Sequence, residues 1–165
     1  MIGNVSITYN KKVKKKKGRV SMKRYIDKEQ SLKIYKRNKE YIQKKECYSN
    51  VFRVITNDPF VIKKIKSEEW MIEYGYINIT DNLYTRHAYL VDTASEKVID
   101  PTMPVYDGFE QEEAKHYYRL HQFKYNDYLD AILKESNMPA LTKHLWKKDL
   151  SMQKKMMEQN MFCIG

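Results

Sequence analysis

The sequence predicts an α+β domain, built from helices and a small antiparallel sheet of three to five strands. Two observations support this prediction. Residues 70–100 are rich in β-branched and aromatic side chains and are punctuated by turn residues, which is typical of strands. The flanking segments, residues 27–56 and 108–161, repeat apolar side chains every three to four positions, which is typical of helices.

Positive charge is concentrated at the start of this 165-residue chain, whose formal net charge is +10. Residues 1–45 contain 16 Lys and Arg against 3 Asp and Glu, a net charge of +13, whereas residues 46–165 contain 15 against 18, a net charge of −3. The length fits one domain with its own core. We therefore divide the chain into a basic N-terminal arm, residues 1–26, and a single α+β domain, residues 27–165.

The arm contains a block of like charge that admits three interpretations. Its members after Val13 are Lys14, Lys15, Lys16, Lys17 and Arg19. Because like charges repel one another, such a block is expected to stay solvated. It also suits electrostatic capture of nucleic acid or of an acidic protein partner. Finally, it matches the composition of a nuclear-import signal.

The composition argues against several classes of protein. The two cysteines lie 116 residues apart, which is not a disulfide framework, so we expect a reduced, cytoplasmic setting. No apolar run approaches the ~18 residues of a membrane span. No hydrophobic stretch follows the N-terminal lysines, as it would in a signal peptide. The sequence has no glycine-rich phosphate loop, and we expect no cofactor.

Two helices are expected before the strands. Residues 27–45 form the first, and residues 46–56 form the second, which Asn57-Asp58-Pro59 ends. Residues 63–69 are interpreted as a polar connector. Because Cys47 lies in the first turn of the second helix, unpaired backbone N–H groups and the helix dipole favour its thiolate and lower its pKa. A lone cysteine is also often a buried core residue, and that alternative stays open.

Residues 70–79 are predicted to be a central strand, and residues 85–102 a β-hairpin. If the hairpin pairs residues whose numbers sum to 187, His87 faces Asp100 with Cβ atoms about 5 Å apart. At that distance a carboxylate accepts a ring N–H of the imidazole, which fixes its tautomer and stabilises its charged form. An imidazole held in this way is the base that a thiol nucleophile requires.

More helices are expected to complete the domain and to cover one face of the sheet. Asp107 is the predicted N-cap of a helix over residues 108–123. Residues 128–134 form a short helix, and another starts at residues 137–139, with its proline early. Residues 151–161 form a polar, Met-rich helix whose methionines are expected to pack on the body of the domain.

Three potential metal ligands lie on the predicted 108–123 helix. Glu112 and His116 lie four residues apart, and His121 follows five residues later. A surface Glu–His pair on a helix is the ordinary explanation of this spacing, and three converging ligands are not evident. We therefore expect no metal site.

Four stretches together resemble a known family: ECYSNVF around Cys47, WMIEYGYI, RHAYLVD around His87, and VIDPT ending beyond Asp100. Over roughly residues 43–104 they look like the transglutaminase-like branch of the papain-like cysteine enzymes. The resemblance implies a small sheet packed against the helix that bears the cysteine. It also implies Cys47 as nucleophile, His87 as general base and then acid, and Asp100 as the residue that orients His87.

Small phage and bacterial proteins of this kind are common, and a phage-encoded member would act in the host cytoplasm. The family usually places a Gln about six residues before the cysteine as an oxyanion donor. Here the candidates are Gln43, four residues before Cys47, and Asn50, three residues after it. The aromatic positions that carry Trp in the family are occupied by Tyr48 and Tyr89.

Two functions therefore follow from the sequence. The first is thiol-dependent acyl transfer, in which the enzyme hydrolyses an amide or peptide bond, or transfers the acyl group to an amine as a transglutaminase does. Its substrate would be a protein or another peptide-like amide. The alternative is a non-enzymatic binding protein, an inactive member of the same fold whose basic arm captures nucleic acid or an acidic protein.

Overall fold

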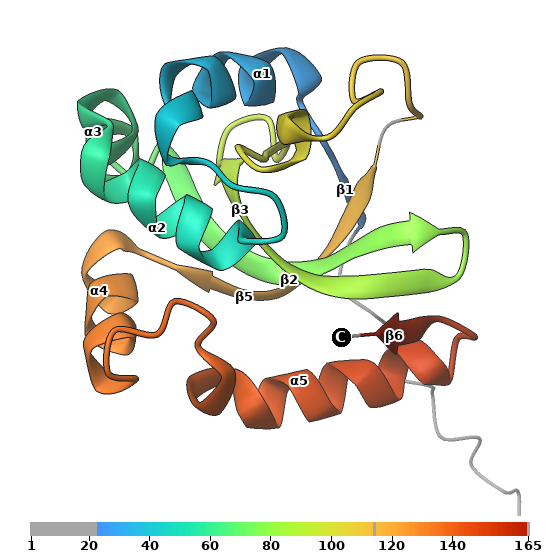
Figure 1. Ribbon diagram of the computed structural model, residues 1–165. Coiled ribbons are helices and arrows are strands. Elements are labelled where there is room, and N and C mark those ends of the chain that lie inside the picture. Colours follow the sequence, from blue (N-terminus) through green and yellow to red (C-terminus); the bar gives the residue numbers. More distant parts are fainter. Residues whose placement is uncertain (1–22, 114, 165) are drawn as a thin grey trace, which may run out of the picture.

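A computed structural model describes residues 23–113 and 115–164, which form an α+β fold with a mixed six-stranded sheet and five α-helices (Figure 1). The strands are β1 (Lys23–Tyr25), β2 (Trp70–Thr80), β3 (Leu83–Asp92), β4 (Val98–Ile99), β5 (His116–Phe123) and β6 (Phe162–Ile164). The α-helices are α1 (Lys28–Arg37), α2 (Cys47–Asn57), α3 (Pro59–Lys66), α4 (Tyr125–Lys134) and α5 (Thr142–Met157), and two short 3-10 helices span Lys39–Tyr41 and Met103–Val105.

The sheet is ordered β1-β5-β2-β3-β4, and β6 pairs with β3. The β3–β6 pair is parallel and the other strand pairs are antiparallel, so the expectation of a purely antiparallel sheet of three to five strands is wrong. The chain directly after β1 returns to the opposite edge of the sheet. There Ile26 forms a parallel bridge with Val98, and the Asp27 N–H donates to the Val98 carbonyl at 2.7 Å. This single bridge links the residue that follows edge strand β1 to the opposite edge strand, β4.

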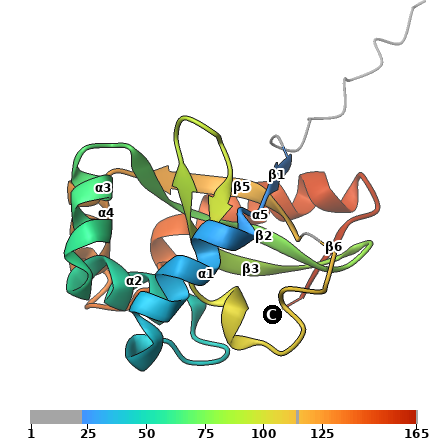
Figure 2. The same ribbon diagram turned by 90° about the horizontal axis from the view of Figure 1, so that it is seen from above.

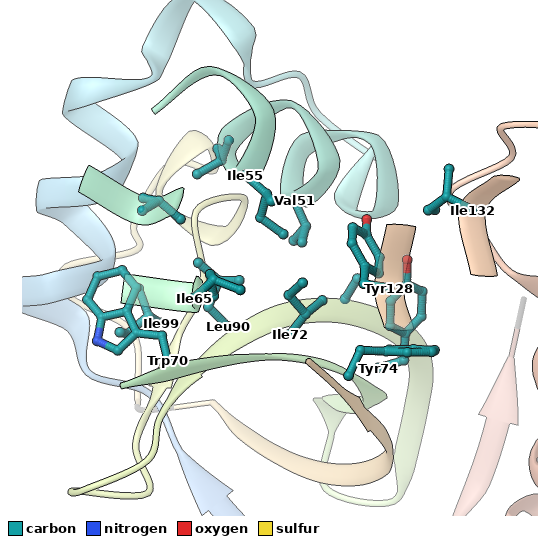
Figure 3. Packing of buried hydrophobic residues seen from close by; sticks show 14 of the residues in the cluster. Val51, Ile55, Ile65, Trp70, Ile72, Tyr74, Leu90, Ile99, Tyr128 and Ile132 are labelled. Carbon is teal, nitrogen blue, oxygen red and sulfur yellow. The ribbon is translucent and has the colours of Figure 1, made fainter. Parts of the chain in front are cut away.

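Helices lie on both sides of the sheet. In Figure 1, α1, α2 and α3 lie above it and α5 lies below, and Figure 2 shows from above how α1 and α2 extend across the strands. The largest core cluster joins α2 to β2 and β3. In Figure 3, Val51 and Ile55 of α2 point toward Ile72 of β2 and Leu90 of β3. All four are fully buried, which fixes α2, and therefore Cys47 at its start, against the two central strands.

The predicted helix over residues 108–123 is wrong. Its second half is strand β5, which pairs with both β1 and β2. The sequence HYYRLHQF contains β-forming tyrosines, and one of them, Tyr117, is fully buried between the two neighbouring strands. Strand β2 pairs along residues 117–123 and β1 pairs with residues 116–118, and this tertiary pairing outweighs the helix-start signal at Asp107.

Other boundaries also differ from the prediction. Residues 59–66, partly assigned to a polar connector, form α3, because Asp58 caps the helix through hydrogen bonds to the N–H groups of Phe60 (2.9 Å) and Val61 (3.5 Å). The two expected C-terminal helices are one continuous helix, α5, on which Met152 and Met156 pack inward as predicted, whereas Met157 is exposed. None of the helices in residues 23–113 and 115–164 is long and apolar enough to cross a membrane.

The N-terminal arm is only partly described. The basic block, including Lys14 to Arg19, falls outside the described residues. Residues 23–26, which the sequence assigned to the arm, instead join the sheet through β1 and the Ile26 bridge. The described domain therefore begins a few residues before the boundary we drew.

Candidate active site

Cys47 is the first residue of α2 and so lies in its first turn, as the sequence predicts, although the helix begins one residue later than expected. Its side chain is buried, with 8% of the residue exposed. The first helical hydrogen bond runs from the Asn50 N–H to the Glu46 carbonyl at 2.7 Å. Within the described part of the chain, the side chain of the N-cap residue Glu46 makes no capping hydrogen bond to this turn. The thiol thus lies at a helix N-terminus, where the dipole stabilises a thiolate.

His87 and Asp100 are in direct contact. His87 Nε2 lies 2.7 Å from Asp100 Oδ2, and both residues are buried. The predicted strand register is nevertheless wrong, because β3 and β4 pair Leu90 with Ile99, so that paired numbers sum to 189 and not to 187. The turn is centred one residue further along the chain, between Ala94 and Ser95, and Glu96 within it has a positive φ of 58°. His87 and Asp100 therefore meet diagonally, beyond the last paired residues.

The carboxylate of Asp100 accepts four hydrogen bonds. Oδ2 accepts from His87 Nε2 and from the Tyr117 hydroxyl at 2.9 Å. Oδ1 accepts from the backbone N–H groups of Thr102 at 2.9 Å and Met103 at 3.2 Å. Such a set of donors holds the carboxylate in one orientation.

The backbone of Asp100 is held separately, from α1. Its N–H donates to Ser31 Oγ at 2.9 Å, and the Ser31 hydroxyl in turn donates to the Asp27 carbonyl at 2.6 Å. Ser31 is fully buried. The start of α1 thus fixes the end of β4, where the chain turns away from the sheet.

Cys47 and His87 each change the pKa of the other. Burial raises the pKa of the Cys47 thiol, but the positive charge and hydrogen bond of His87, together with the Ala88 N–H, outweigh burial and lower that pKa below its usual value. Burial lowers the pKa of His87, but Asp100 and Cys47 together raise it well above 6.5. Since Asp100 occupies Nε2, Nδ1 is the ring nitrogen that remains for the thiol. These two shifts act in the directions that favour a thiolate–imidazolium pair.

Asn50 does not serve as an oxyanion donor. Its Nδ2 donates to the Gln43 carbonyl at 2.7 Å and to Thr102 Oγ1 at 3.1 Å, and its Oδ1 accepts from the Gln43 N–H at 2.9 Å. Its amide hydrogens are therefore used inside the fold, and the prediction for Asn50 is wrong. Asn50 instead ties the loop before Cys47 to the loop that follows Asp100.

Gln43, the other oxyanion candidate, is exposed, and its hydrogen bonds to Asn50 use its backbone. This arrangement leaves the Gln43 side chain at the surface of the loop that precedes Cys47. Gln43 thus stays a candidate donor, next to the N–H groups of the first turn of α2.

Tyr48, which follows Cys47, is anchored by aromatic stacking. Its ring stacks on Tyr74 with centroids 5.6 Å apart, and the Arg86 guanidinium lies 5.2 Å from the Tyr48 ring. Arg86 is held in turn by an ion pair with Asp149 of α5 at 3.1 Å and by a hydrogen bond to the Ala140 carbonyl at 2.6 Å. The first turn of α2 is thus fastened to β2, β3 and α5.

Two residues that sequence reasoning missed, Tyr117 and Ser31, contact Asp100. Tyr117 was missed because its segment was assigned to a helix, although the β-forming content of HYYRLHQF was a usable signal. Ser31 lies one turn into α1, and no local pattern distinguishes a serine that contacts another element from any other helical serine.

The residues considered for a metal site lie on β5 or just before it, not on a helix. His116 Nε2 lies 3.0 Å from the Tyr84 hydroxyl, and His121 lies beside Lys148 and the ring of Phe123. Among residues 23–113 and 115–164, no three His, Cys, Asp or Glu side chains cluster as a metal site requires.

Comparisons with known proteins do not assign this chain to a family. No protein-family model, no curated protein and no solved structure matches it. The fold and the site therefore rest on the chain's own residues and geometry.

Proposed function

We propose that this protein is a thiol-dependent acyl-transfer enzyme of transglutaminase-like, papain-like architecture, with Cys47, His87 and Asp100 as its catalytic residues. The observation that supports this most strongly is the buried His87–Asp100 contact of 2.7 Å beside a cysteine whose pKa is lowered at a helix N-terminus. A thiol in a purely structural role needs neither a charged partner nor a helix dipole.

In the proposed reaction, the Cys47 thiolate attacks the carbonyl carbon of an amide, which forms a C–S bond and an oxyanion. Backbone N–H groups at the start of α2, and the Gln43 side chain, are the candidate donors to that oxyanion. His87 then gives its proton to the leaving nitrogen as the C–N bond breaks. The product at this stage is an amine and a thioester on Cys47.

Deacylation reverses the role of His87. The neutral imidazole takes a proton from water or from an acceptor amine, which attacks the thioester and releases a carboxylic acid or a new amide. The thiolate is regenerated and His87 is charged again. Asp100 stabilises the imidazolium in both steps and does not itself exchange a proton.

An activated ester tests this proposal without knowledge of the substrate. The full-length protein would be mixed with p-nitrophenyl acetate, and the acetylated residue located by peptide mass spectrometry. We expect acetyl transfer to Cys47, loss of this label in Cys47→Ala, and a rate reduced at least tenfold in His87→Ala. Labelling of Cys163 at the rate of Cys47, or a rate unaffected by His87→Ala, would argue against the proposed enzyme.

A second candidate function, binding of an anionic partner, rests on a different observation. Between β5 and α5 lies a groove of about 450 Å³, lined by Arg119, Leu120, Lys147, Lys148, Ser151, Met152 and Lys155. The four basic side chains lie on a body, residues 46–165, whose net charge is −3. Beside the groove, burial and then the charges of Lys148, His144 and Arg119 lower the pKa of His121 to about 4. A concentrated positive potential of this kind attracts polyanions.

This second function predicts salt-dependent binding of a labelled single-stranded oligonucleotide by the full chain. Lys147→Gln with Lys155→Gln should weaken binding and reduce its salt dependence. Lys143→Gln with Lys154→Gln, on the same helix but outside the lining of the groove, is the charge-matched control. Equal binding by the two double variants would exclude the groove as the binding surface.

A further inference from the structure

Tyr117 is an unassigned member of the candidate active site. It lies on β5, is fully buried, and donates its hydroxyl hydrogen to Asp100 Oδ2 at 2.9 Å. This is the same oxygen that His87 Nε2 contacts at 2.7 Å. We propose that Tyr117 is a positioning residue of this site, whose hydroxyl holds Asp100 Oδ2 toward His87 and draws part of the carboxylate charge away from the imidazolium. The proposal rests on the proposed function of the Cys47–His87–Asp100 set.

The distribution of donors around Asp100 supports this role. The backbone N–H groups of Thr102 and Met103 both bind Oδ1. Oδ2 therefore has two partners among the described residues, His87 and Tyr117. A hydroxyl donor and a cationic donor on one carboxylate oxygen compete for its charge. The Tyr117 hydrogen bond consequently weakens the interaction of Oδ2 with His87 while it fixes the position of the oxygen.

Few charged or titratable groups face His87, so the effect of one hydroxyl can be isolated. Cys47 approaches from α2, Asp100 from the end of β4, Tyr117 from β5, and Tyr89 from the strand of His87 itself. Behind Tyr89 lies a buried ion pair, in which Arg24 Nε is 3.3 Å from Glu73 Oε1.

A weaker Asp100–His87 interaction has a catalytic use. Asp100 and Cys47 together raise the pKa of His87, and an imidazolium that is stabilised too strongly is a poor proton donor to the leaving amine. By taking a share of the charge on Oδ2, Tyr117 keeps the pKa of His87 closer to neutral pH. Loss of the Tyr117 hydroxyl should therefore raise the pKa of His87, which distinguishes the proposed role from simple packing.

Tyr89 provides a matched control. Like Tyr117, it is a fully buried tyrosine whose ring neighbours His87, with centroids 6.3 Å apart for Tyr89 and 6.2 Å for Tyr117. Its hydroxyl also donates to a carboxylate, but to Glu73 at 2.9 Å and not to Asp100. Tyr89→Phe and Tyr117→Phe thus remove the same atom from similar surroundings, and differ in whether that atom touches Asp100.

The test is an NMR titration of His87 in the full-length protein, in a Cys47→Ala background so that the coupled thiol does not titrate with it. We expect Tyr117→Phe to raise the pKa of His87 by about half a unit to one unit, which is less than a full hydrogen bond to a charged group is worth, because the lost bond acts on His87 only through Asp100. We expect Tyr89→Phe to leave it unchanged. 3-Fluorotyrosine at position 117 is a stronger hydrogen-bond donor of similar size and should lower the pKa of His87. This substitution replaces the Phe variant in the test if Tyr117→Phe does not fold.

The outcomes separate this inference from the proposed function. An elevated pKa of His87 that Tyr117→Phe does not raise, or that Tyr89→Phe raises equally, overturns the role of Tyr117 and leaves the catalytic set intact. An ordinary pKa of His87 in the Cys47→Ala background shows that the Asp100 pair does not form, and overturns both.

Discussion

Asp100 Oδ2 lies 2.7 Å from His87 Nε2, although the strands that carry the two residues are paired two positions away from the register that would place them opposite each other. The contact forms in spite of the shifted register because His87 and Asp100 both lie beyond the last pair of the β3–β4 ladder, Leu90 with Ile99, and can approach each other diagonally. There the Asp100 backbone is held by Ser31, and its carboxylate by Tyr117 and two backbone N–H groups.

The charge of Asp100 is predicted to matter more than its shape. Asp100→Asn keeps the size of the side chain but removes the charge that stabilises the imidazolium, and it presents an amide to the donors around it. We expect acetyl transfer to Cys47 at pH 7 to fall by roughly two to four orders of magnitude, measured by mass spectrometry. Asp107→Asn, an exposed carboxylate in the following loop, should have the wild-type rate. A wild-type rate in Asp100→Asn would remove Asp100 from the mechanism.

Asn50 is predicted to stabilise the loops that flank the site. Asn50→Ala removes hydrogen bonds to Gln43 and Thr102 inside a buried region, which should lower the free energy of unfolding by about 2 kcal/mol. Denaturation in urea, followed by circular dichroism, measures this change. Asn57→Ala provides a control of the same residue type in the same helix, since Asn57 is exposed. If the two variants are equally stable, the loops are not held by Asn50.

Gly75 is predicted to be intolerant of any side chain. A Cβ atom there would overlap the carbonyl oxygen of Tyr118 on β5 and would lie 2.5 Å from the Tyr89 hydroxyl. Because the carbonyl belongs to a paired strand, the sheet itself must shift, and we expect Gly75→Ala to cost on the order of 3 kcal/mol of unfolding free energy. Gly108→Ala is the comparison: its positive φ of 82° adds strain, but the space around it is open. Equal stability losses in the two variants would contradict the close approach of β2 and β5.

Asp58 is predicted to make stability depend on acid pH. Burial raises the pKa of the Asp58 carboxyl, but Arg37, Asn38 and the Phe60 N–H outweigh it and lower this pKa to about 2. Since the folded value lies below the ordinary 3.8, the stabilisation is complete above about pH 4 and is lost as the pH falls toward 2. Its size is of the order of 2 kcal/mol.

The check on Asp58 is the difference in unfolding free energy between wild type and Asp58→Asn, measured from pH 7 to pH 2. This difference should be large at neutral pH and should shrink below pH 4. Asp130→Asn removes an exposed carboxylate from α4 and should show a small, nearly constant difference. A constant difference for Asp58→Asn would indicate that the carboxylate contributes through its shape and not its charge.

The sequence was informative where local signals decide the structure. The start of α2 at Cys47 and the long strands around His87 follow from helix-start and strand patterns. The identity of β5 did not, because its backbone hydrogen bonds come from β1 and β2, which lie about 40 to 95 residues earlier in the chain. The β3–β4 register depended on the position of one turn, and a turn with Glu96 at positive φ is not evident from its residues. The pairing of β6 with β3 is equally non-local.

The pH dependence of Cys47 alkylation tests the central claim most directly. Iodoacetamide labelling would be followed by peptide mass spectrometry, in wild type and in His87→Ala, with Cys163 as an internal reference. Burial and then Asp149 raise the pKa of the Cys163 thiol to about 11, so that it should react slowly. We predict that Cys47 reacts fast with a midpoint well below pH 8.5, and that His87→Ala moves this midpoint upward. A Cys47 as slow as Cys163, or one unaffected by His87→Ala, would contradict a thiolate–imidazolium pair and with it the proposed enzyme.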